Sequence, residues 1–69
     1  MEKINQRIKN LLREKQITTL EFEEDTRISR RILYDTSRRP HKSTLMGIAY
    51  YLGITLEDLV SETDMETIL

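Results

Sequence analysis

The stretch RISRRILYDTSRRPHK, residues 27–42, holds the side chains with the clearest chemistry in this chain. It places six Lys or Arg residues and one acid in sixteen positions of a protein whose formal net charge is only -1. A guanidinium group offers a planar fork of N–H donors that matches the paired acceptors of a phosphate or a guanine. The cluster therefore indicates a polyanion partner, and nucleic acid is the first candidate.

The charge of the chain is divided between two parts. Residues 1–42 carry all eleven Lys and Arg residues against seven acids, for a charge of +4, whereas residues 43–69 carry five acids and no Lys or Arg, for a charge of -5. Such an asymmetry is typical of a protein that turns one basic surface toward a polyanion. A solvated helix face is the plainer interpretation of a basic run, and only the arrangement of the helices favours DNA over it.

The residue types that most enzymes need are scarce. The chain has no cysteine, a single histidine, no glycine-rich phosphate loop and no paired metal-ligand spacing. We therefore expect no enzyme activity, no catalytic residue, no metal, no cofactor and no small-molecule substrate. The N-terminus lacks the apolar core of a signal peptide, and no apolar run approaches the roughly 20 residues that span a bilayer. This predicts a cytoplasmic protein without a membrane partner.

The periodicity and the cap residues predict short helices in a single all-α domain. Ile4, Ile8, Leu11 and Leu12 recur at the spacing of an amphipathic helix. Three later helix starts share one pattern. An isoleucine stands directly before a hydroxyl residue that can cap a helix, and an apolar residue five positions after the isoleucine can pack against it as a hydrophobic staple. The three sets are Ile17-Thr18 with Phe22, Ile28-Ser29 with Leu33, and Ile54-Thr55 with Leu59.

These signals predict five helices, with a helix-turn-helix in the middle. We expect them over about residues 2–15, 19–26, 30–37 and 43–52, and from residue 55 onward. Thr18 with Glu21 has the spacing of a capping box, as has Thr55 with Asp58, and Gly53 is placed to end the fourth helix. The second and third helices are joined by only a few residues, which is the connection of a helix-turn-helix.

Two stretches of the sequence match a known pattern. ITTLEFEEDTRISRRIL, residues 17–33, and RPHKSTLMGIAYYLGITLEDLV, residues 39–60, resemble the phage repressor and Cro type helix-turn-helix family, also called XRE-like. The most specific part is TLxxIAxxLGITLEDL, residues 44–59. The resemblance covers about residues 4–60 and implies a compact, lambda-repressor-like bundle of five short helices, usually a dimeric transcriptional regulator that binds double-stranded DNA.

The chain departs from that family at four positions. Glu23 stands where the second helix usually has a small Ala, and Arg27 stands where the turn favours Gly. Two further usual glycines fall near Gln16 and Arg39. If such a position needs a left-handed backbone, a residue with a Cβ costs about 1 kcal/mol there. We expect the Glu23 carboxylate to reach the edge of the domain and to pair with Arg27 or Arg31.

The resemblance also implies which residues contact DNA, because the second helix of the pair enters the major groove and the first crosses the backbone. The base-contacting positions are then Arg30, Arg31, Tyr34 and Asp35. Asp35 could accept from cytosine or could hold Arg31 or Arg38 in place, and Ile32 could pack on a thymine methyl. The phosphate-contacting positions are Thr19, Ser29, Arg38, Arg39 and Lys42.

The leading hypothesis is a sequence-specific transcriptional regulator, a repressor that occupies an operator as a homodimer. The alternative is a protein-interaction module on the same scaffold, such as an antirepressor or an antitoxin-like partner binder, because the net charge is slightly negative and the tail is partly apolar. We expect residues 1–61 to form the domain and residues 62–69 to be a short tail, either frayed or in contact with a dimer partner. The expected dimer surface consists of Leu56, Val60, Met65, Ile68 and Leu69.

Overall fold

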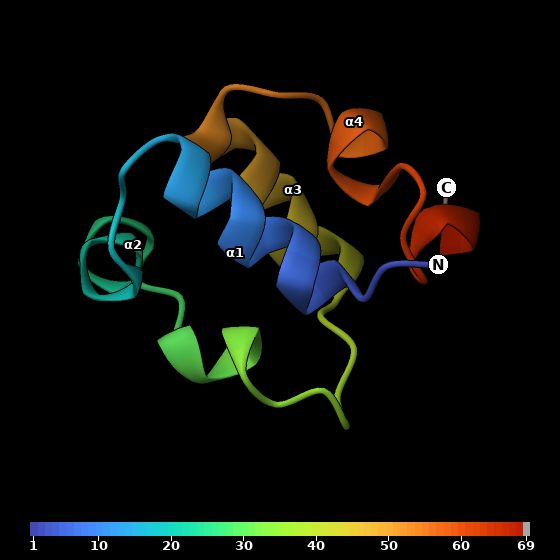
Figure 1. Ribbon diagram of the computed structural model, residues 1–69, viewed down its shortest axis with the longest axis horizontal. Helices are drawn as coiled ribbons and strands as arrows, with labels where there is room; N and C mark the ends of the chain where they lie inside the picture. The colour runs from blue at the N-terminus through green and yellow to red at the C-terminus, as the bar shows by residue number, and fades with distance from the viewer. Residues whose placement is uncertain (69) are drawn as a thin grey trace.

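Short helices joined by tight turns make up the chain, as the computed structural model of residues 1–68 shows (Figure 1). The elements are α1 (Ile4–Glu14), α2 (Thr19–Thr26), η1 (Arg30–Leu33), α3 (Lys42–Leu52), α4 (Leu56–Val60) and η2 (Glu66–Ile68), where η1 and η2 are 3-10 helices. The predicted all-α class is confirmed. Over the same residues, no helix is both long and apolar enough to cross a membrane.

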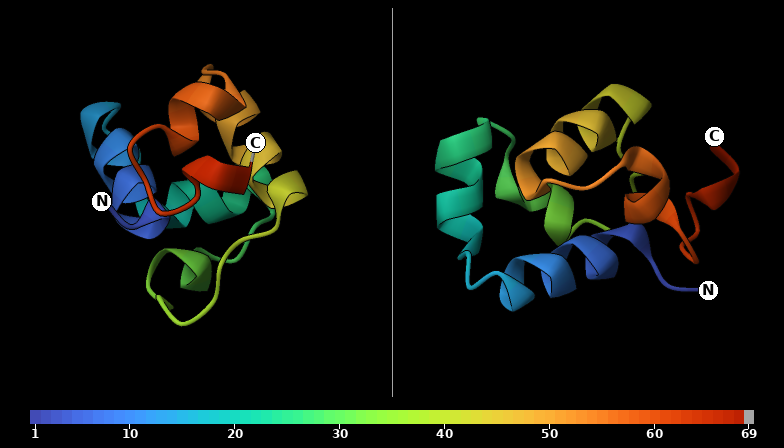
Figure 2. Two further views of the ribbon diagram at one scale, coloured as in Figure 1. Left: turned by 90° about the vertical axis from the view of Figure 1, so that its right-hand side faces the viewer. Right: turned by 90° about the horizontal axis from the view of Figure 1, so that it is seen from above.

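The core forms where the apolar faces of the helices meet. α1 contacts α2, η1 and α4, and α3 contacts α2 and α4. Ile4, Ile8 and Leu12 of α1 are at most 2% exposed, so the predicted amphipathic stripe is confirmed. The other elements bury against it side chains that are equally inaccessible, namely Phe22, Leu33, Leu45, Ile48 and Leu59. Figure 2 shows the same helices from two further sides.

The predicted cap residues begin and end the helices. Thr18 Oγ1 accepts a hydrogen bond from the Glu21 backbone N–H at 3.0 Å, and Glu21 Oε1 accepts one from the Thr18 N–H at 3.2 Å, which completes the capping box of α2. Thr55 Oγ1 accepts from the Asp58 N–H at 3.0 Å at the start of α4. Gly53 ends α3 in the left-handed conformation with φ 73°. The Thr18 capping box and the Gly53 stop are confirmed, and at Thr55 the hydroxyl half of the predicted box is present.

The helix predicted over residues 30–37 is a single 3-10 turn, Arg30–Leu33, and residues 34–41 form a loop. Side chains take up the backbone groups that would continue the helix. Asn5 Nδ2 donates to the Ile32 carbonyl at 2.8 Å, and the Asp35 carboxylate accepts from the Ser37 N–H at 3.1 Å. Such local bonds compete with helix formation. Pro40 then disfavours a helical backbone at the residue before it.

The segment after α4 closes on the N-terminus, and η2 and the N-terminus lie on the same side of the domain (Figures 1 and 2). The Glu2 N–H donates to the Glu62 carbonyl at 3.2 Å, and the Asp64 N–H donates to the Glu2 carbonyl at 2.9 Å. Asp64 Oδ1 also accepts from the Ile4 N–H at 2.9 Å, at the first turn of α1. The boundary expected at residue 61 therefore divides segments that pack together.

Burial changes the expected dimer surface. Val60 and Met65 are at most 1% exposed within their own domain, so neither side chain is available to a second copy. Leu56 is half-buried and packs at the margin of the core. The side chain of Ile68 and the whole of Leu69 lie outside the described residues. The expectation that Val60 and Met65 lie on the surface missed the fold-back of the tail, which brings Met65 into the core.

Candidate nucleic-acid interface

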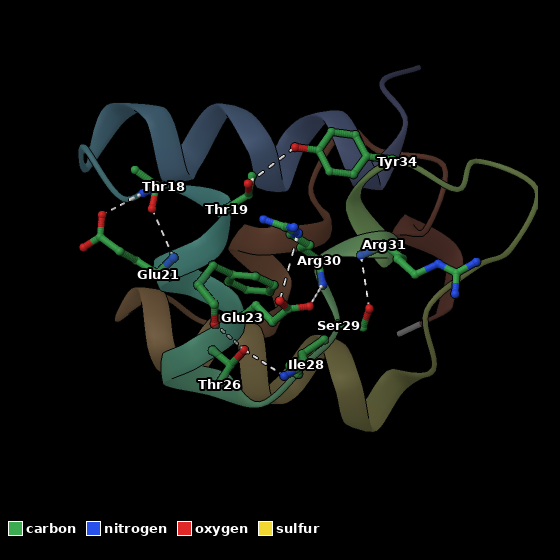
Figure 3. A network of polar contacts seen from close by, with 11 residues as sticks. Thr18, Thr19, Glu21, Glu23, Thr26, Ile28, Ser29, Arg30, Arg31 and Tyr34 are labelled. Carbon is green, nitrogen blue, oxygen red and sulfur yellow. Dashed lines mark hydrogen bonds and ion pairs between the residues drawn. The ribbon is translucent and has the colours of Figure 1, made fainter.

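The turn between α2 and η1 sets the geometry of the candidate interface. Arg27 ends α2 with φ 63° and ψ 16°, in the left-handed region, and its N–H donates to the Glu23 carbonyl at 2.9 Å. The Thr26 hydroxyl donates to the Phe22 carbonyl at 2.7 Å and accepts from the Ile28 N–H at 3.1 Å (Figure 3). Thr26 therefore closes the turn from the α2 side.

Two of the three positions expected to favour glycine do have a left-handed backbone. Gln16 has φ 59° and Arg27 has φ 63°. The third position, Arg39, is not among the residues with positive φ in residues 1–68. A residue with a Cβ pays about 1 kcal/mol for this conformation, so both Gln16 and Arg27 carry backbone strain.

Glu23 connects α2 directly to the start of η1. Its Oε2 accepts a hydrogen bond from the Arg30 backbone N–H at 2.9 Å, and its Oε1 lies 4.0 Å from Arg30 Nε (Figure 3). The predicted partners were Arg27 or Arg31, and the structure gives Arg30 instead. The reason is that the free N–H at the start of η1 lies within reach of the carboxylate. This acid, where the family usually has Ala, thus fixes where η1 begins.

Arg30, Arg31 and Tyr34, three of the four expected base-contacting residues, point in different directions (Figure 3). Arg30 turns back toward α2, whereas Arg31 points away from it, toward the side of the loop 34–41. Tyr34 extends toward α1, where Lys9 Nζ lies 5.2 Å from the centre of its ring. The Tyr34 hydroxyl donates to Thr19 Oγ1 at 3.5 Å. Tyr34 is nevertheless 58% exposed, so more than half of the residue remains accessible.

Asp35 is occupied within its own loop. Its carboxylate accepts from the Ser37 hydroxyl and backbone N–H, and its Oδ2 lies 4.0 Å from Arg38 Nε. The bond from the Ser37 hydroxyl is the main reason that the pKa of Asp35 lies below its ordinary value. Of the roles left open for Asp35, the structure favours holding Arg38 over accepting from cytosine.

A hollow of about 540 Å³ brings much of the basic cluster together. It lies between η1, the loop 34–41 and the start of α3, and its lining includes Ser29, Arg31, Arg38, Arg39 and His41. Ile28, Ile32 and Pro40 contribute apolar surface to it. Lys42 is exposed on the first turn of α3, next in sequence to this lining. Thr19 lies apart from it, beside Tyr34 at the start of α2.

Asn5 is the residue of this site that the sequence did not reveal. It is 3% exposed, and its Nδ2 donates to the carbonyls of Ile32 at 2.8 Å and Asp35 at 3.4 Å. An amide buried in α1 thereby holds the C-terminal end of η1. The one signal in the sequence for a buried Asn5 was its position directly after Ile4, which begins the buried stripe of the first helix.

Comparison with known proteins agrees with this geometry. A family model described as the Cro/C1-type HTH DNA-binding domain matches residues 7–64. Searches of curated proteins and of solved structures find no match. The matched residues include α2, the turn at Arg27, η1 and the basic loop, which are the parts that build the candidate interface. The chain therefore belongs to the Cro/C1-type helix-turn-helix DNA-binding family.

Proposed function

We propose that this protein is a sequence-specific transcriptional regulator that represses by occupying an operator. The observation that carries the proposal is the basic hollow beside η1, which gathers Arg31, Arg38 and Arg39 at the second element of a helix-turn-helix. In such a motif the second element enters the major groove. A domain that binds there represses most simply by excluding other proteins from the same DNA.

The proposed contacts fall into two groups. Arg30, Arg31, Tyr34 and Asp35 lie at or just after η1, and Arg31 and Tyr34 are the two proposed to meet base edges. Glu23 engages Arg30, and Asp35 is bonded within its own loop. Thr19 at the start of α2, Ser29 in the turn, and Arg38, Arg39 and Lys42 around the hollow contact phosphates on either side. Phosphate contacts fix the register of a protein on the duplex, and base contacts supply the sequence preference.

A homodimer on a two-fold site is part of the proposal. Its half-sites would lie about 34 Å apart, one turn of the DNA helix, as in other helix-turn-helix dimers. Of the expected dimer residues within the described chain, Leu56 is the one with accessible surface. Light scattering with and without a palindromic duplex tests the dimer. A mass that corresponds to one protein per duplex would contradict it.

Fluorescence anisotropy with a labelled mixed-sequence duplex tests DNA binding itself. We expect binding that weakens steeply with salt, and a shallower salt dependence for Lys42→Gln, because each lost phosphate contact lowers the slope by about 1. Lys3→Gln is the matched control, because Lys3 is an exposed lysine next to Glu2, which bonds the acidic tail. No binding at low salt would contradict the proposal and would favour the protein-interaction module.

A further inference from the structure

We propose that Arg31 reads base edges and that Arg30 does not, an inference that rests on the proposed function. The two arginines are adjacent in sequence and have the same chemistry, so the sequence alone gives them equal roles. Their surroundings differ. Glu23 Oε2 holds the Arg30 backbone N–H at 2.9 Å and Glu23 Oε1 lies 4.0 Å from Arg30 Nε. The Arg31 N–H is bonded to the neutral Ser29 hydroxyl at 3.3 Å.

The Glu23 carboxylate keeps Arg30 from making a bidentate contact with guanine. An exposed ion pair at this distance is weak by itself. The position of the carboxylate is fixed, however, by its bond to a backbone N–H, which is charge-assisted and therefore stronger. If Arg30 extended to a base, this carboxylate would stay behind near the phosphates and repel them. Arg30 is better suited to neutralise Glu23 at the edge of the interface.

Arg31 meets no such obstacle. Its guanidinium points away from Glu23 (Figure 3), and neither of the two ion pairs found in residues 1–68 includes it. It lines the hollow together with Arg38 and Arg39, whose proposed phosphate contacts would hold the DNA backbone beside it. The one acid in that lining, Asp35, accepts from Ser37 and forms its ion pair with Arg38. Arg31 can thus offer its whole fork of donors to a base.

The test separates base reading from charge. A preferred site is first selected from a pool of random duplexes with the wild-type protein, and the ratio of its affinity to that of a mixed-sequence duplex is measured. Arg31→Lys keeps the charge but loses the fork. It should lower this ratio by about 5- to 150-fold, the fold-change that corresponds to one bidentate base contact. Arg30→Lys is the matched variant and should leave the ratio unchanged within about twofold.

The outcomes distinguish this inference from the proposed function. Three results would overturn the assignment of base reading to Arg31 while leaving DNA binding itself intact. The affinity ratio could fall in Arg30→Lys alone, fall equally in both variants, or fall in neither. A wild-type protein that binds no duplex overturns the proposed function and the inference together. Circular dichroism confirms that each variant folds. Arg31→Gln serves as the second variant if Arg31→Lys does not fold.

Discussion

The connection from α3 to α4 and the connection from α2 to η1 use the same kinds of residue but close by different hydrogen bonds. Gly53-Ile54-Thr55 and Arg27-Ile28-Ser29 each place a left-handed residue, an isoleucine and a hydroxyl cap in a row. After α3, the Ile54 N–H donates to Ala49 at 3.0 Å and the Gly53 N–H to Tyr50 at 3.1 Å. This pair of backbone bonds is a Schellman motif.

After α2, one backbone bond is replaced by a side chain. The Arg27 N–H donates to the Glu23 carbonyl at 2.9 Å, the single bond of an αL motif, and the Ile28 N–H donates to Thr26 Oγ1 at 3.1 Å. The next free N–H, that of Arg30, donates to the Glu23 carboxylate. The turn between α3 and α4 is therefore fixed by backbone hydrogen bonds, whereas the direction of η1 depends on two side chains of α2, Thr26 and Glu23. The element proposed to face DNA is therefore the one whose direction single substitutions can change.

The largest expected effect on stability comes from removing the Thr26 hydroxyl, which closes the turn after α2. Thr26→Val keeps the shape of the residue but leaves the half-buried Ile28 N–H without its partner. We expect the free energy of unfolding to fall by about 1 to 3 kcal/mol, the cost of a buried unsatisfied group. Urea unfolding followed by circular dichroism measures it. Thr36→Val, at an exposed position in the loop 34–41, is the control, and equal losses in both variants would contradict the role given to Thr26.

A smaller effect, with opposite signs in the two turns, is expected at the left-handed residues. Arg27→Gly should raise the free energy of unfolding by up to about 1 kcal/mol, and Gly53→Ala should lower it by a similar amount. A Cβ at Gly53 would meet no atom within 4 Å, so the loss reflects the backbone alone. Each kcal/mol corresponds to about 4 to 8 °C in Tm for a domain of this size.

Gly47→Ala is the matched control for these substitutions. Gly47 lies within α3, and a Cβ there also meets no atom within 4 Å. The same change should therefore raise the free energy of unfolding by about 0.5 to 1 kcal/mol, because Ala is the better helix former. A lower Tm for Arg27→Gly would contradict this prediction. It would show that the arginine side chain stabilises the turn by more than the left-handed backbone destabilises it.

Features set by neighbours in sequence could be predicted, and features set by distant contacts could not. The capping box at Thr18, the stop at Gly53 and the buried stripe of α1 depend on residues a few positions apart, and all three were predicted correctly. The shortness of η1 depends on Asn5, which reaches across 27 positions to the Ile32 carbonyl. No pattern around residue 32 contains that contact.

The same distinction explains the errors in the site and in the tail. The partner of Glu23 was expected among Arg27 and Arg31, but the left-handed backbone at Arg27 brings the N–H of Arg30 to the carboxylate instead. Met65 was assigned to the dimer surface together with the other apolar residues of the tail. Its burial requires the bonds between residues 62–64 and Glu2, which join opposite ends of the sequence.

The smallest expected effect is a pH dependence confined to the end of η1. α3 ends on a glycine, Gly53, whereas η1 is followed by an acid, Asp35. The Asp35 carboxylate accepts hydrogen bonds from the Ser37 hydroxyl and backbone N–H. These bonds hold the folded pKa below the ordinary value of 3.8, so their contribution to stability is present above pH 3.8 and is lost as the pH falls through the lowered pKa. Asp35→Asn should therefore be less stable than wild type at pH 6, and the gap should shrink toward pH 3.

Comparison with Gly53→Ala makes this prediction specific to one turn. The backbone conformation at Gly53 involves no ionisable group, so the stability difference between Gly53→Ala and wild type should be the same at both pH values. Urea midpoints for the three proteins at the two pH values give both differences directly. A gap for Asp35→Asn that does not change with pH would mean that the loop is held by its neutral hydrogen bonds alone. The two turns would then differ in bonding pattern but not in their response to acid.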